Sequence, residues 1–355
     1  MTTPEAQTPT IEWVDGSIHL IDQTRLPGEF AIVNAHRVPV LVDAIKTLAV
    51  RGAPAIGVAG AYGVALAARE FPPETDRAKF DEAIESIRSA RPTAVNLAKR
   101  VDEVLDAIRS SNEPPAQAAL TEAHLIRDEE LASSIAMGEK GAYLVLDLCD
   151  GGPVTTMTIC NTGGLATVER GTALAVIQRL HELGHLVEAL PVETRPLLQG
   201  GRLTTWELHR MGAPFRLMVD SAGPFLLSKG AADVVLIGAD RIAANGDTAN
   251  KIGSFSLALG ARHAGVPFIV VAPESTIDME TATGADIEIE DRGAAEVISA
   301  MGTPIAEAHT PAVNPAFDVT PASLITAIVT EKRVIRLDQG EELELIDSLS
   351  PKDIL

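Results

Sequence analysis

The stretch VTTMTICNTGGLAT, residues 154–167, decides the fold. It joins a short β-branched run to a Gly-rich turn, and four more apolar runs follow, separated by helical patterns. Strands that alternate with helices in this way form a parallel sheet with helices on both faces. We therefore expect a doubly wound α/β fold after about residue 140. The five runs, in chain order, are VTTMTI, LVEAL, FRLMV, DVVLIG and PFIVVA.

The chain before this sheet has a different pattern. Residues 11–34 predict short strands with turns at Asp-Gly and Pro-Gly, and helical periodicity follows. We expect a smaller, mostly helical N-terminal domain with a small sheet over residues 1–135, and the sheet domain over 136–355. The expected helices of the first domain cover residues 41–50, 54–70, 77–89, 96–110 and 115–138.

The charge balance argues against a nucleic-acid partner. The chain has 49 acidic and 29 basic residues, a formal charge of −20, which repels a phosphate backbone. A few local Arg or Lys side chains can still bind a small anion, so their positions matter more than the sum. With 46% hydrophobic and only 3% aromatic residues, small aliphatic side chains must fill the core.

Several sequence signals for compartment and cofactor are missing. The two cysteines, Cys149 and Cys160, lack the spacing of a zinc site, and a reducing cytoplasm fits them best. The first residues do not resemble a signal peptide, and the uncharged run 52–68 is rich in Gly and Ala, as in a packed helix, so no membrane is expected. Phosphate-loop and dinucleotide motifs are not apparent, and we expect neither a nucleotide nor a metal cofactor.

Polar residues follow each of the five runs, and ligands of doubly wound folds bind beyond the carboxyl ends of the strands. Cys160 follows the first run. If a helix begins near Leu165, its N-terminus favours the thiolate and makes Cys160 a usable base or nucleophile. The alternative is a small buried hydrophobic side chain.

A second motif is GADRIAANGDTANKIGS, residues 238–254. Asp240 ends a strand at the same edge, and burial that raised its pKa would make it a general acid. The alternative is a helix cap or a partner of Arg241. Asn250 and Lys251 are expected to open the next helix, where an amide, an ammonium and free backbone N–H groups suit a phosphate.

Further anion-binding candidates lie in the first domain. In RGAPAIG, Pro54 fits the first turn of a helix, so the amides of Gly52 and Ala53 lie at its N-terminus beside Arg51. Close packing alone could also explain these glycines. Arg91 flanks a helix that Pro92 ends, and it is a possible second guanidinium or an ordinary surface arginine.

The segment ETRPLLQGGRLTTWEL, residues 193–208, follows another strand. Gln199 is a weaker ligand candidate there. An ion pair of Glu193 with Arg195 or Arg202 is an equally good, purely structural account.

These motifs, with RPTAVNL and NPAFDVTP, resemble the methylthioribose-1-phosphate isomerases of methionine salvage. Their wider family includes the regulatory alpha, beta and delta subunits of the initiation-factor guanine-exchange complex. The resemblance runs in order from residue 11 to residue 331. It implies a homodimer with a Rossmann-like C-terminal domain, and a reaction from 5-methylthioribose 1-phosphate to 5-methylthioribulose 1-phosphate.

The resemblance also implies roles for single residues. Cys160 and Asp240 are the implied catalytic pair. The implied substrate contacts are Arg51, Gly52, Ala53, Arg91, Gln199, Asn250 and Lys251. The chain departs from the family pattern at Ile159, where a histidine often precedes the cysteine, which leaves open how the thiol is activated.

Two alternatives remain at this point. One is an isomerase of a related phosphosugar, ribose 1,5-bisphosphate or 5-deoxyribose 1-phosphate, because only the pocket for the 5-substituent would differ. The other is a non-catalytic binding subunit. The regulatory relatives typically lack the cysteine and do not keep the full pair, whereas Cys160 and Asp240 are both present here.

Overall fold

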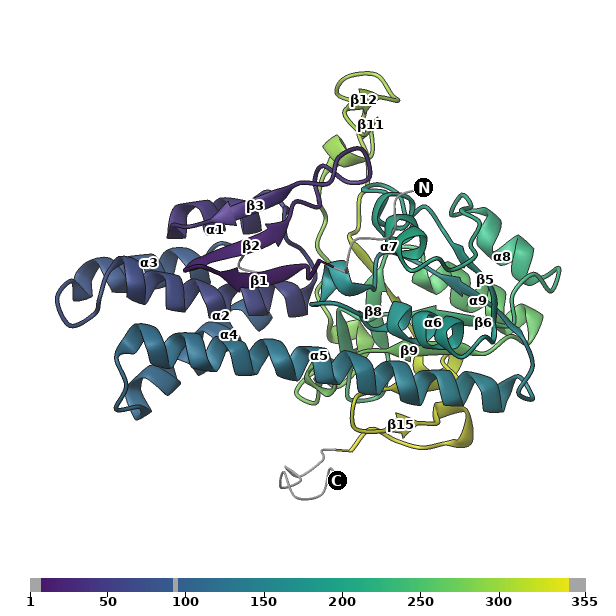
Figure 1. The fold of residues 1–355 in the computed structure, drawn as a ribbon. Helices are drawn as coiled ribbons and strands as arrows, with labels where there is room; N and C mark the ends of the chain where they lie inside the picture. The colour runs from purple at the N-terminus through teal and green to yellow at the C-terminus, as the bar shows by residue number, and fades with distance from the viewer. Residues whose placement is uncertain (1–7, 92–94, 345–355) are drawn as a thin grey trace.

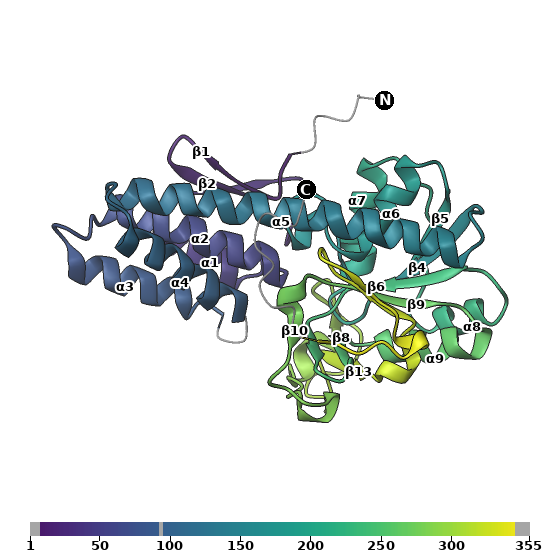
Figure 2. The same cartoon turned by 90° about the horizontal axis from the view of Figure 1, so that it is seen from below.

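The computed structural model describes residues 8–91 and 95–344, which form a helical part and a sheet part joined by one long helix (Figure 1). That helix, α5 (Pro115–Leu148), is 34 residues long and contacts α2 (Ala53–Glu70) in the first part and α6 (Ala173–Glu182) in the second. Figure 2 shows it running past both. The boundary at residues 135 and 136 stays a prediction, and α5 runs across it.

The helical part follows the sequence pattern closely. Three short strands form the predicted antiparallel sheet, and α2 lies buried beneath it and the neighbouring helices. A Cβ on Gly60 would lie 2.6 Å from a Leu97 methyl carbon, so the Gly-rich face of α2 allows close packing. The other elements here are β1 (Ile11–Val14), β2 (Ser17–Ile21), β3 (Ile32–Ala35), α1 (Val38–Lys46), α3 (Arg77–Arg88) and α4 (Val95–Ser110).

Within the described residues, none of the helices is both long and apolar enough to cross a membrane. The uncharged run 52–68 forms most of α2, and its side chains pack into the core of the helical part.

The sheet part contains a six-stranded sheet in the order β15-β14-β9-β6-β4-β5. All neighbouring strands are parallel except the last hairpin, β14 with β15. The chain starts at β4, adds β5 on one side and then crosses to β6 on the other side of β4. The strand order therefore reverses at β4. The strands are β4 (Val154–Thr158), β5 (Leu186–Pro191), β6 (Val234–Ile237), β9 (Phe268–Val271), β14 (Ala327–Val329) and β15 (Val334–Ile335).

Helices cover both faces of this sheet, as predicted. Along β6, Val234 and Leu236 pack into the cluster that contains residues of α5 and α6. Val235 and Ile237 pack into the opposite cluster, with residues of α8 (Ala222–Leu227) and α9 (Ser254–Ala264). Every residue of β6 is buried, as expected for a strand covered on both sides.

Two sequence predictions for this part were wrong. FRLMV, residues 215–219, runs beside β5 and makes only isolated bridges, from Phe215 to Ala189 and from Met218 to Val192. Leu217 and Val219 point to solvent, so this segment lies at the exposed edge of the sheet without forming a regular strand.

The second error concerns a small sheet with the order β10-β7-β8-β13, which the sequence pattern did not indicate. Its strands have two to four residues, too few to show a clear period. They are β7 (Arg241–Ala243), β8 (Thr248–Lys251), β10 (Ile277–Asp278) and β13 (Phe317–Thr320).

Candidate active site

The topology directs attention to the ends of β4 and β6. Ligands of open parallel sheets bind beyond the carboxyl ends of the strands, at the point where the strand order reverses. Cys160 follows β4 and Asp240 follows β6, and these two strands are neighbours. The fold thus places both residues of the predicted catalytic pair beyond the carboxyl ends of neighbouring strands, where the crevice of such sheets lies.

Cys160 is held by its backbone. Its N–H donates to Thr194 Oγ1 at 2.8 Å, and its carbonyl accepts from Thr204 Oγ1 at 2.6 Å. The residue is buried and has φ 65°, a strained conformation for a side chain other than glycine. Such strain in a loop held on both sides is typical of functional sites.

The expectation of a helix N-terminus beside the thiol was wrong. Only a three-residue 3₁₀ helix, Gly164–Ala166, follows the cysteine, and α6 begins at Ala173. The glycines instead fold the loop tightly on itself, because a Cβ on Gly164 would lie 2.2 Å from the Glu169 carbonyl oxygen. The dipole of a long helix therefore does not activate Cys160 in the way the sequence pattern indicated.

The start of α2 lies against the loop of residues 160–166, called the cysteine loop from here on. Gly52 has φ 90°, and a Cβ there would lie 2.3 Å from the Ala166 carbonyl oxygen. Arg51 donates through Nη2 to Asn161 Oδ1 at 2.6 Å. Ala53 is the first residue of the helix and is exposed, so its amide can meet a ligand. An arginine beside free N–H groups at the start of an 18-residue helix is suited to a phosphate.

Three cations act on the Asp240 carboxyl. Desolvation by the surrounding protein raises the pKa of Asp240, and the charges of Lys251, Arg51 and Arg91 oppose this rise without cancelling it. Asp240 is nevertheless exposed to solvent. A carboxyl that keeps its proton more readily than usual is suited to general acid catalysis.

Asn250 and Lys251 end strand β8 instead of opening a helix, which corrects the sequence prediction. β8 pairs with β7 and β13, and Asp240 N–H donates to the Ala249 carbonyl at 2.9 Å. Both side chains already have protein partners. Asn250 donates to Ser254 Oγ at 2.8 Å, and the Lys251 ammonium donates to the Ala316 carbonyl at 2.9 Å.

Arg91 is half-buried, and desolvation lowers its pKa, with Arg292 and Arg51 adding to this effect. The sequence analysis did not propose Arg292. Pro92, predicted to end the helix before Arg91, lies outside the described residues.

Gln199 is buried, and its Oε1 has no hydrogen-bond partner among the described residues. No described hydrogen bond joins it to the other candidates, so its role as a ligand stays a prediction. The arginines of this segment are structural. Arg195 donates to the Val297 carbonyl at 2.8 Å, and Arg202 donates to the Gln23 carbonyl at 2.7 Å.

The sequence analysis did not propose Asn161 or Glu207 as residues of the site. Asn161 bridges Arg51 and Glu207, because its Nδ2 donates to Glu207 Oε1 at 2.6 Å. The signal for Glu207 was present in the sequence, since it lies four and three residues after the buried Leu203 and Thr204, which is helical spacing. An acidic residue on an apolar helix face indicates a buried partner.

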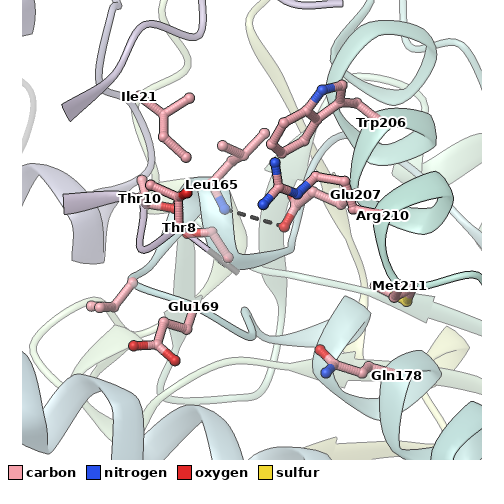
Figure 3. Close-up of a pocket in the computed structure, with 12 residues that line it drawn as sticks. Thr8, Thr10, Ile21, Leu165, Glu169, Gln178, Trp206, Glu207, Arg210 and Met211 are labelled. Carbon is pink, nitrogen blue, oxygen red and sulfur yellow. Dashed lines mark hydrogen bonds between the residues drawn. The ribbon is translucent and has the colours of Figure 1, made fainter. Parts of the chain in front are cut away.

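A pocket opens beside Glu207, which is one of its lining residues (Figure 3). Leu165, Trp206 and Arg210 line it, and none of the predicted site residues does. It is therefore distinct from the crevice at Cys160 and Asp240. Within the part of the chain that the structure describes, no group of three or more His, Cys, Asp or Glu side chains could hold a metal ion.

Comparison with known proteins adds the family. The model described as "Initiation factor 2 subunit family" matches residues 49–336. The chain belongs to this family.

Members of the initiation factor 2 subunit family resemble the chain over almost its whole length. A Geotalea uraniireducens protein named methylthioribose-1-phosphate isomerase is 44% identical, over 95% of this chain and 98% of that protein. A Moorella thermoacetica protein named 5-deoxyribose 1-phosphate isomerase is 46% identical, over 92% of this chain and 93% of that protein.

A Nocardia farcinica protein named probable bifunctional methylthioribose-1-phosphate isomerase/methylthioribulose-1-phosphate dehydratase is 47% identical over 92% of this chain. The chain spans only 59% of that protein's length.

Solved structures of the initiation factor 2 subunit family share the fold. The 5-methylthioribose 1-phosphate isomerase of Pyrococcus horikoshii has a TM-score of 0.87 at 39% identity, covering 94% of this chain and 95% of that one. An A. fulgidus structure, named as translation initiation factor eIF-2B, subunit delta, has a TM-score of 0.84 at 40% identity, covering 92% and 96%. The two-part α/β architecture is therefore that of the family.

Proposed function

We propose that the protein is an aldose–ketose isomerase that converts 5-methylthioribose 1-phosphate to 5-methylthioribulose 1-phosphate in methionine salvage. One observation carries the proposal: the Asp240 carboxyl, with its raised pKa, shares the crevice at the strand-order reversal with Cys160 and is faced by Arg51, Arg91 and Lys251. An acid beside a cluster of cations suits a phosphorylated sugar. The names of the Nocardia farcinica and Geotalea uraniireducens relatives, at 47% and 44% identity, agree with it.

The substrate explains why an acid is needed. Its phosphate is attached through the anomeric oxygen, so the ring cannot open by loss of a hydroxyl proton, and the bond between C1 and O4 must be broken with help. Asp240, in its protonated form, donates to O4 as this bond breaks. A ketone at C2 also requires the C2 hydroxyl to lose its proton, and a carboxylate that has just donated can accept it.

Cys160 takes the second part of the reaction. It removes the proton from C2 of the ring-opened cation, which gives an enol phosphate, and the return of this proton to C1 leaves the carbonyl at C2. The phosphate contacts are Arg51 with the amides of Gly52 and Ala53, together with the side chains of Arg91, Gln199, Asn250 and Lys251. A direct hydride shift from C2 to C1 is the competing route, and solvent deuterium at C1 of the product distinguishes the two.

A second substrate has an observation in its favour. The Moorella thermoacetica relative, at 46% identity, carries the name 5-deoxyribose 1-phosphate isomerase. That substrate shares the phosphate end and the ring with the first and differs at the 5-substituent. Ribose 1,5-bisphosphate differs there as well, but its second phosphate would require more basic residues.

The experiment is turnover of the three sugar phosphates by the wild type, Cys160→Ser and Asp240→Asn. The proposal predicts that 5-methylthioribose 1-phosphate has the highest kcat/KM and that both variants lose it. A higher kcat/KM on 5-deoxyribose 1-phosphate would transfer the assignment to that substrate. If none of the three is turned over, a non-catalytic binding subunit is favoured instead. The A. fulgidus protein is named as a subunit of a translation initiation factor.

The proposal includes a homodimer in the cytoplasm, with a small phosphosugar as the ligand and no nucleic acid or membrane as partner. Exposed apolar side chains on neighbouring helices α8 and α9 support an interface, because a lone monomer seldom leaves such a group in water. They are Phe225, Phe255 and Leu259. Sedimentation equilibrium tests it: the wild type is expected as a dimer, and Phe225→Glu as a weaker one. A monomeric wild type would contradict it.

A further inference from the structure

Asn161 has two charged neighbours that fix the direction of its side chain. Its Oδ1 accepts from Arg51 Nη2 at 2.6 Å, and its Nδ2 donates to Glu207 Oε1 at 2.6 Å. The two bonds require opposite ends of the amide, so they are made together only in this orientation. Arg51 precedes α2, Asn161 follows Cys160, and Glu207 belongs to α7 (Thr205–Arg210). Three distant segments thus meet at one amide.

Glu207 holds the cysteine loop at a second point. Its Oε2 accepts from the Leu165 N–H at 3.3 Å, the contact drawn as a dashed line in Figure 3. A Cβ on Gly163 would lie 2.4 Å from Glu207 Oε1, so the loop needs glycine where it crosses the carboxylate.

The same helical segment supports Cys160 directly. Thr204, three residues before Glu207, donates to the Cys160 carbonyl at 2.6 Å. Glu207 is half-buried, and desolvation raises its pKa to about 7. No salt bridge to Glu207 is found among the described residues, so an ion pair does not explain why a carboxylate lies here. Within the part of the chain that the structure describes, its hydrogen bonds lead to Asn161 and Leu165, both in the cysteine loop.

We propose that Glu207 is a positioning residue for the reaction, which through Asn161 sets the direction of the Arg51 guanidinium and the position of the loop that carries Cys160. This inference rests on the proposed isomerase function. A neutral glutamine at 207 can accept one bond with its oxygen, but its other terminal group is a donor. It cannot satisfy both Asn161 and the Leu165 N–H, so the amide of Asn161 loses its fixed direction.

A double-mutant cycle tests this coupling. The proteins are wild type, Glu207→Gln, Arg51→Lys and the double variant, each assayed for KM and kcat with 5-methylthioribose 1-phosphate and for the dissociation constant of inorganic phosphate. If Glu207 acts through Arg51, we expect Glu207→Gln to raise KM and the dissociation constant of phosphate about tenfold in the protein with Arg51. In the protein with Lys at position 51, the same change should raise them less than about twofold. Equal losses in the two backgrounds would overturn the proposal.

A matched control separates positioning from general destabilisation. Glu130 is a buried glutamate, bonded to Arg100 at 2.9 Å in the helical part. Glu130→Gln is expected to leave KM, kcat and phosphate binding within about twofold of the wild type. If it weakens them as much as Glu207→Gln does, the effect of the latter is not positioning, and the proposal fails.

Two further outcomes are distinguishable. If Glu207→Gln does not fold, Asn161→Ala replaces it in the same cycle, since that change removes the bridge and leaves the carboxylate. If the wild type binds phosphate without turning over any sugar phosphate, the proposed function fails. The phosphate dissociation constants then still decide the coupling of Glu207 to Arg51.

Discussion

Arg51 donates a hydrogen bond of 2.6 Å to Asn161, the residue directly after Cys160, although 110 positions separate them in the chain. This bond links the start of α2 in the helical part to the loop beyond β4 in the sheet part. The groups proposed to bind phosphate and the proposed base are therefore joined before any substrate arrives. Fixed geometry of this kind is what makes reacting groups effective.

Gly52 has to be glycine for two separate reasons. Its φ of 90° is strained for other residues, and a Cβ would meet the Ala166 carbonyl oxygen at 2.3 Å. We expect Gly52→Ala to lower the free energy of unfolding by about 2 to 4 kcal/mol. Because Ala166 belongs to the cysteine loop, we also expect a higher KM. Urea denaturation and steady-state kinetics measure the two effects.

Gly184 is the matched control. Its φ is 77°, but nothing lies within 4 Å of a Cβ placed there. We therefore expect Gly184→Ala to lower the free energy of unfolding only through the strain of a positive φ, by about 1 kcal/mol. Equal losses of stability in the two variants would show that the contact with Ala166 is unimportant.

Removing Lys251 is expected to change the pH profile. The charge of Lys251 lowers the pKa of Asp240, so Lys251→Met raises that pKa. If protonated Asp240 is the acid, kcat/KM falls as the pH rises through the pKa of Asp240. The variant should therefore keep its remaining activity to a higher pH, by up to about one unit.

The matched control for Lys251→Met is Lys229→Met, which also removes a lysine that lies over an aromatic ring. Lys229 lies 5.5 Å from the Phe225 ring centre, as Lys251 lies 4.4 Å from that of Phe317. Its profile should match the wild type. A descending limb that stays in place or moves to lower pH in Lys251→Met would contradict the role of Asp240.

Glu207 gives stability a pH dependence of known sign. Desolvation raises its pKa from 4.5 to about 7 in the folded chain. Between these values the folded chain holds a proton that the unfolded chain has lost, so stability falls as the pH rises through this window. Between pH 4.5 and 7, the free energy of unfolding of the wild type should fall by up to about 3 kcal/mol relative to that of Glu207→Gln.

Urea denaturation of both proteins at several pH values measures this difference. Taking the difference removes the contributions of other groups, including Asp318, whose pKa burial raises to about 6. A difference that does not change with pH would mean that Glu207 titrates as it does in the unfolded chain.

The parallel sheet and the first helices could be predicted because their patterns are long. The apolar runs at β4, β6 and β9 are buried on both faces, and α2 begins one residue from its predicted start. The strands of the small sheet could not be predicted. They are short, and tertiary pairing to β13, far along the chain, makes β8 a strand in a segment rich in turn residues.

The site was predictable only in part. Polar residues after strands predicted Cys160 and Asp240, because parallel strands end at one edge of the sheet. The charges of Arg51, Arg91 and Lys251 all act on Asp240, and their role as phosphate contacts stays a prediction. Asn161 and Glu207 could not be paired from sequence, because 46 positions separate them and only the folded loop brings the amide to the carboxylate.

The most direct test of the central claim is kcat of Asp240→Asn on 5-methylthioribose 1-phosphate beside that of Asp233→Asn. Asp233 precedes β6 at the opposite end of the same strand, where it accepts from the Thr155 N–H at 2.7 Å. The account predicts a loss of about 10² to 10⁴ for Asp240→Asn, the range for a lost general acid, and near wild-type turnover for Asp233→Asn. Turnover of Asp240→Asn within about threefold of the wild type would contradict it.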